Sequence, residues 1–110
     1  MSFTPYHNID GSSAQEVELI GINDILRGSI KSIHLNNIHT SSAATIDLYL
    51  NKFSTDTTAE ESYFILHNYS LGAKNFLTID NLALLNFDNS TYALFVHVES
   101  SDTVDIFLNK

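Results

Sequence analysis

The 110-residue sequence contains no cysteine, which excludes disulfide bonds, thiolate nucleophiles and cysteine-ligated metal sites. Basic residues are scarce: five Lys and Arg stand against 13 Asp and Glu, giving a formal net charge of −8. Nucleic acids and anionic membranes attract basic surfaces, so we expect neither as a partner. Long apolar runs are also missing, so the sequence predicts no transmembrane helix. Residues 1–7 lack a basic and then apolar segment, so we expect no signal peptide.

The residues that are present suit a folded domain. Charged residues make up 16% of the chain, below the roughly 25% of ordinary domains. Hydrophobic residues make up 44%, which is too many for an acidic disordered chain. A chain of this length can bury about two thirds of its surface, so a core needs no metal or disulfide. The polar surface is then largely Ser, Thr and Asn.

Apolar and polar residues alternate in several segments, the pattern of β-strands with one buried face. The clearest segment is 44–52, where Ala44, Ile46, Leu48 and Leu50 point to one side. Further strands are predicted at 15–20, 27–38, 63–66, 76–79, 92–99 and 104–109, with a break in the chain from residue 68 and some helical character at 81–85. The pattern predicts an all-β fold, an antiparallel β-sandwich or jelly-roll-like domain of about seven to eight strands.

Two details of organisation follow from the turn residues. Residues 1–13 are predicted to form a short N-terminal arm, because Pro5 disfavours regular strand pairing and 10–13 read as a turn. Residues 14–110 then form a single β-sandwich domain. The last two strands, 92–99 and 104–109, are separated by a short loop, which predicts a β-hairpin.

No established catalytic motif is present, so we expect no enzyme, cofactor or metal site. The five histidines include no H-x-H pair, the common metal-binding spacing on a strand. A site that brings His67 and His97 to Asp47 by folding stays open as the alternative. A loop-bound calcium ion on oxygen ligands such as Asp80, Asn81, Asp88 and Asn89 is a second alternative.

Aromatic residues lie on strand positions opposite to the predicted core. They are Tyr49, Phe95 and Phe107, together with Phe64 or Tyr63, depending on which of these two points outward. Water-exposed sheet faces rarely carry aromatic side chains. Either this face is covered within the domain, or it contacts another subunit, where aromatic residues are enriched. The second interpretation predicts an oligomer. Together with the arm, it gives these candidate interface residues: Phe3, Pro5, Tyr6, Tyr49, Phe64, Phe95 and Phe107.

Five segments together resemble small structural proteins of tailed bacteriophages, especially marine ones: residues 3–7, 31–37, 42–50, 62–68 and 102–110. This resemblance implies a β-sandwich made in the host cytoplasm and assembled onto the virion as a head decoration, neck or tail component. It implies no catalytic residues. The implied partners are further copies of the chain, as a homo-oligomer such as a trimer, and the major capsid or neck and tail proteins.

The resulting hypothesis is a non-enzymatic virion structural protein, foremost a capsid decoration or stabilising protein that acts through subunit contacts. A neck, tail or fibre-associated position is the alternative within this class. A glycan-binding module for host-surface attachment is the alternative from another class. It would use Tyr6, Tyr49, Tyr69 or Tyr92 as stacking platforms.

Overall fold

Eight β-strands and one short helix make up the part of the chain that the computed structural model describes, residues 3–10, 16–25, 30–53, 59–99 and 102–109. For residues 3–10, 53, 59, 60 and 83 this description covers the backbone. The elements are β1 (Phe3–Asp10), β2 (Glu16–Ile20), β3 (Ser32–Asn37), β4 (Ala44–Phe53), β5 (Ala59–Leu71), β6 (Phe76–Ile79), α1 (Leu82–Leu85), β7 (Tyr92–Val98) and β8 (Thr103–Asn109). Among these residues no helix has the length and apolar character that crossing a membrane requires.

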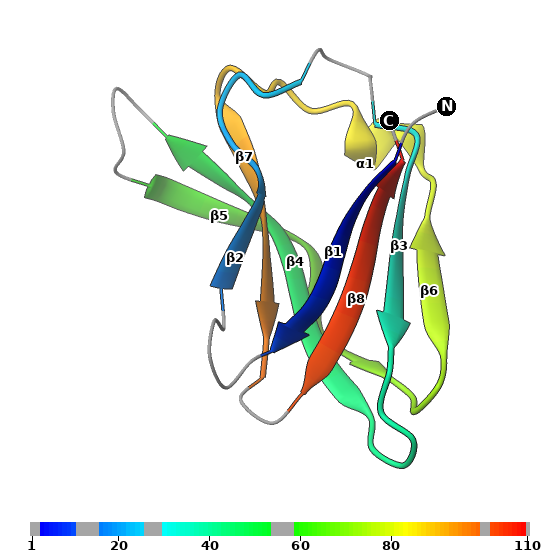
Figure 1. Cartoon of the computed structure of the whole chain (residues 1–110). Helices are drawn as coiled ribbons and strands as arrows, with labels where there is room; N and C mark the ends of the chain where they lie inside the picture. Colours follow the sequence, from blue (N-terminus) through cyan, green and yellow to red (C-terminus); the bar gives the residue numbers. More distant parts are fainter. Residues whose placement is uncertain (1–2, 11–15, 26–29, 54–58, 100–101, 110) are drawn as a thin grey trace.

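The strands form two four-stranded sheets, ordered β1-β8-β3-β6 and β2-β7-β4-β5 (Figure 1). Every pairing is antiparallel. The pairs are nested, since β1 joins β8, β2 joins β7, β3 joins β6 and β4 joins β5. A strand ribbon folded over on itself in this way is a jelly roll. The predicted all-β sandwich is therefore confirmed, with jelly-roll connectivity.

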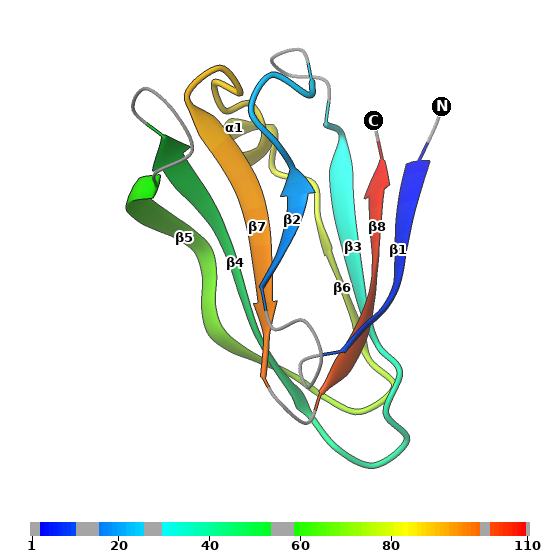
Figure 2. The same cartoon turned by 60° about the vertical axis from the view of Figure 1, so that its left-hand side comes forward.

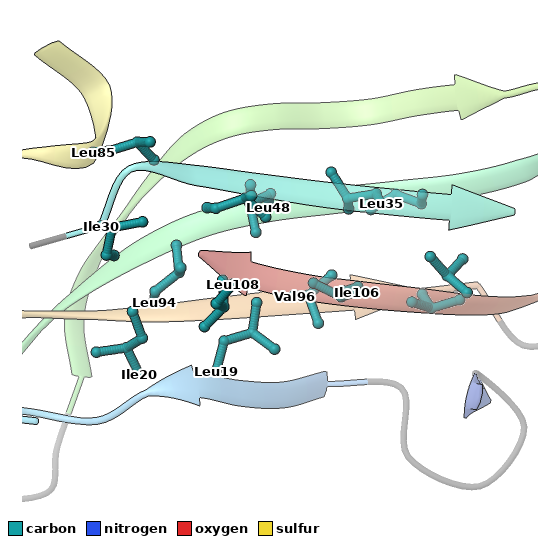
Figure 3. Packing of buried hydrophobic residues seen from close by; sticks show 14 of the residues in the cluster. Leu19, Ile20, Ile30, Leu35, Leu48, Leu85, Leu94, Val96, Ile106 and Leu108 are labelled. Atoms are coloured by element: carbon teal, nitrogen blue, oxygen red, sulfur yellow. The ribbon is translucent and has the colours of Figure 1, made fainter. Parts of the chain in front are cut away.

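The core lies between the two sheets (Figures 2 and 3). On β4, Ala44, Ile46 and Leu48 are at most 1% exposed, as their alternation predicts. The facing sheet contributes Ile33 and Leu35 from β3, and β8 adds its own alternating residues: Val104, Ile106 and Leu108. Each sheet thus buries one face and presents the other outward, and the outward faces carry the candidate site.

The predicted N-terminal arm is wrong for residues 3–10, which form β1 at the edge of the first sheet. β1 pairs with β8 from Phe3 opposite Asn109 to Asp10 opposite Thr103, with one register shift between Tyr6 and Ile9. Pro5 fits there because an edge strand has a free side, where a residue without an N–H costs no ladder bond. The rest of the predicted arm lies outside the described residues.

The predicted hairpin of the last two strands is also wrong, because β7 and β8 belong to different sheets. β7 pairs with β2 and β4, whereas β8 pairs with β1 and β3. The connection instead crosses the sandwich. Its ends are fixed by the Asp102 carboxylate, which accepts the Thr45 N–H at 2.8 Å, and by the Asp102 N–H, which donates to the Glu99 carbonyl at 3.0 Å.

Candidate functional site

The outer face of the β2-β7-β4-β5 sheet carries the aromatic residues that the sequence places opposite the core. Tyr49 on β4 stands between Phe95 on β7 and Phe64 on β5, its two register partners. The Tyr49 and Phe95 rings stack at 6.0 Å between centroids with a 12° interplanar angle. The Phe64 ring lies 5.4 Å from Tyr49 at 48°. We call the outer face around these three residues the Tyr49 face.

Tyr49 is 6% exposed although it points away from the core. Its hydroxyl donates a hydrogen bond to the Glu16 carboxylate on β2. Burial raises the pKa of Tyr49 well above its ordinary value, and the hydrogen bond to Glu16 and the charges of Glu16 and Asp47 raise it further. The phenol therefore keeps its proton and acts as a packing and hydrogen-bonding anchor for the face.

The same face brings together the three residues of the alternative metal site. Nδ1 of His67 lies 3.3 Å from Oδ1 of Asp47, and Nδ1 of His97 lies 3.5 Å from Oδ2. Asp47 Oδ1 also accepts the backbone N–H of Asn68 at 2.5 Å. Asp47 thus ties β5 to β4 and lies between two imidazoles. Nevertheless, among the described residues no group of three or more His, Cys, Asp or Glu could hold a metal ion.

Phe107 does not belong to the Tyr49 face, contrary to the single aromatic face that the alternation suggests. It lies on β8, in the other sheet, and points to the opposite side of the sandwich. There the His34 ring lies 6.0 Å from Phe107 and 5.1 Å from Phe76. His34 Nδ1 is 2.8 Å from the Thr78 hydroxyl oxygen. Alternation within a strand sets its two faces, but the sheet to which the strand belongs decides which outer surface it reaches.

The remaining candidate interface residues, Phe3, Pro5 and Tyr6, lie on β1 opposite Asn109, Phe107 and Ile106 of β8. Their side chains are outside the described part of the structure. Their backbone pairs with β8 on one side, and the other side of β1 is a sheet edge.

Buried polar residues hold the loops at the two ends of the sandwich. Asn37 donates its side-chain amide to the carbonyls of Ser42 and Leu71, both at 2.9 Å. Asn89, at 3% exposure, accepts the Ile25 N–H and donates to the Gly21 carbonyl. Both side chains fix loops. In the sequence, each of these residues is an Asn beside a turn. That pattern does not indicate that the side chain is buried.

Two of the candidate calcium ligands, Asp88 and Asn89, are likewise engaged in local structure. Asp88 Oδ1 accepts the N–H and the hydroxyl of Ser90, at 3.0 and 2.6 Å. Asn89 is the loop-fixing residue described above. His39, at the opposite end, accepts the Thr103 N–H through Nε2 at 3.1 Å. These polar groups hold the connections between strands.

Comparisons with protein-family models, curated proteins and solved structures found no match. The resemblance to phage structural proteins therefore stays a prediction. The site is defined by geometry alone. It consists of an aromatic cluster around the buried Tyr49, the hydrogen bond from Asn68 of β5 to Asp47, and exposed aromatic side chains on β5.

Proposed function

We propose that the chain is a non-enzymatic structural subunit of a tailed-bacteriophage virion, made in the host cytoplasm, that decorates and stabilises the capsid through subunit contacts. The observation that carries this proposal is the strand order, β1-β8-β3-β6 against β2-β7-β4-β5. Jelly rolls of this kind build viral capsid and lectin domains. The choice between those two classes depends on the surface, because one fold hosts many functions.

The surface favours the structural role over glycan binding. Sugar stacking needs an open aromatic face, and Tyr49 is 6% exposed beneath Phe64 and Phe95. Tyr92 is half-buried, and its ring meets Tyr63 edge-on at 5.9 Å. Tyr69, at 37% exposure, is the open member of the three described platforms. Two of the three described platforms are therefore engaged within the domain.

The polar interior supports the same role. The four buried polar residues of the described chain, Asn37, Asn51, Asn89 and Asp102, each make a hydrogen bond within the domain. These contacts hold loops and neighbouring strands in place. Such an arrangement gives a rigid shell unit whose contacts with the major capsid protein, or with neck or tail proteins, come from its outer faces and edges.

Mass spectrometry and electron cryomicroscopy of purified particles from a lysate of the producing host test this proposal. We expect the chain in intact particles at a fixed stoichiometry, with density on the capsid exterior. Density at the neck, tail or fibres would replace the capsid position and keep the structural class. Absence from particles, together with saturable binding on a glycan array, would reject the structural role in favour of the lectin-like one.

A further inference from the structure

The four edges of the two sheets differ in how they are protected against pairing with another chain. Natural edge strands are kept short, charged or interrupted by proline, because their free N–H and C=O groups invite a further strand. β1 contains Pro5, β2 has five residues including Glu16 and Glu18, and β6 has four residues. β5, the edge of the second sheet, has 13 residues.

β5 has register shifts with β4 on either side of Leu66, but it lacks charged residues and proline over most of its length. From Ser62 to Leu71 it contains no Asp, Glu, Lys, Arg or Pro. Three of its aromatic side chains are exposed: Tyr63 at 45%, Phe64 at 50% and Tyr69 at 37%. Figures 1 and 2 show β5 on the side of the molecule away from β1 and β8. This edge is therefore long, neutral and aromatic.

The register of β5 with β4 shows which side chains share a face. Tyr63 lies opposite Leu50, Leu66 opposite Leu48, and Tyr69 opposite Ile46, so all three are on the core side of the sheet. Register shifts fall on either side of Leu66, between Leu48 and Tyr49 and between Ile46 and Leu48 on β4. An antiparallel copy of β5 centred on Leu66 would thus set Tyr63 opposite Tyr69, on matching faces. Such aromatic cross-strand pairs stabilise sheets.

Charge restricts where a second copy can approach. Two copies with a formal net charge of −8 each repel one another, and like charges placed directly opposite destabilise a strand pair. The neutral run from Ser62 to Leu71 has no such charges. In the arrangement centred on Leu66, Glu61 would face Leu71 of the other copy and not a second carboxylate. The acidic surface and the neutral edge are thus compatible with self-association at β5.

We propose that β5 pairs antiparallel with β5 of a second copy about a two-fold axis, joining the two β2-β7-β4-β5 sheets into one continuous sheet. Two-fold symmetry suits this edge, because an isologous contact uses the same strand from both copies. The inference rests on the proposed function, which requires contacts between copies, and it assigns one of those contacts to this strand.

Sedimentation equilibrium of the purified chain tests the pairing, with the Tyr69→Glu variant and a matched Phe76→Glu control on β6. Both substitutions remove an exposed aromatic and add one negative charge. We expect a wild-type dimer whose Kd rises at least about tenfold in Tyr69→Glu, while Phe76→Glu stays within about twofold. Circular dichroism checks that both variants fold. A monomeric wild type, or equal effects of the two substitutions, would overturn the proposal.

Hydrogen exchange provides a second measurement that does not depend on a variant. Amides of β5 that point away from β4 should exchange slowly in the dimer and rapidly after dilution to monomer. Slow exchange confined to another element on dimerisation would show that a different surface pairs. These solution results are separate from the particle analysis: a monomer found on virions would reject the β5 contact alone, and a β5 dimer absent from virions would reject the virion role alone.

Discussion

At the residue scale, Tyr49 combines an outward position with burial. It is covered by two aromatic rings and bonded to Glu16, all within its own sheet. The sequence leaves two interpretations of the outward aromatic residues: coverage within the domain, or contact with another subunit. Tyr49 is covered within the domain. The half-exposed Phe64 is the member of this group that remains open to a neighbour.

The environment of Tyr49 predicts a pH dependence of stability. Burial and Glu16 raise the pKa of Tyr49, so the folded chain keeps the phenol proton at pH values where the unfolded chain, with a tyrosine pKa of about 10, loses it. The free energy of unfolding should therefore fall as the pH rises above about 10, by up to about 1.4 kcal/mol per pH unit from this group. Urea denaturation between about pH 8 and about pH 11 measures this fall.

The Tyr49→Phe variant should lose this part of the pH dependence, since it has no phenol proton to release. The Tyr69→Phe variant is the control, because it removes a hydroxyl from an exposed tyrosine. We expect Tyr69→Phe to retain the wild-type fall. The same fall in Tyr49→Phe as in the wild type would contradict the assignment.

At the element scale, β5 departs from the sequence prediction in its length and its continuity. The predicted strand 63–66 and the break from residue 68 become one strand from Ala59 to Leu71. Asn68 has a φ of 51°, a left-handed conformation that Asn adopts more readily than most residues. The Asp47 carboxylate accepts the backbone N–H of Asn68. The backbone at Asn68 therefore forms a β-bulge, and β5 continues beyond it.

The conformation of Asn68 predicts opposite effects for two small substitutions. Asn68→Ala should lower the free energy of unfolding by about 1 kcal/mol or more, because a Cβ without a compensating polar group is disfavoured at positive φ. Asn68→Gly should stay within about 0.5 kcal/mol of the wild type, since glycine adopts this region freely. Chemical denaturation compares the two. Equal losses would show that the side chain of Asn68, and not its backbone conformation, is what matters.

At the scale of the whole molecule, β1 closes the first sheet by pairing along β8. Deleting residues 1–10 should therefore expose the β8 edge and lower the melting temperature by about 5 °C or more. Deleting residues 1–2 is the matched control, because it leaves β1 in place. Thermal unfolding followed by circular dichroism measures both variants. An unchanged melting temperature in the longer deletion would show that this segment behaves as the arm that the sequence predicts.

Much of the local structure could be read from the chain. The inward residues of β4, β7 and β8 follow from a two-residue period. The predicted strands 76–79 and 92–99 correspond to β6 and β7, which end at Ile79 and Val98. The one segment with helical character contains α1. These features depend on neighbours within a few residues, so a single sequence contains the information.

The sequence by itself determined that the chain is all-β, which side of its clearest strands faces the core, and that Tyr49 and Phe95 point outward. The tertiary structure alone decided that β7 and β8 lie in different sheets, that Phe107 faces the opposite surface, that residues 3–10 form an edge strand and that His67 and His97 meet Asp47. Alternation is a property of one strand, whereas pairing depends on which distant strands bury the most apolar surface together. That choice is made only when the whole chain folds.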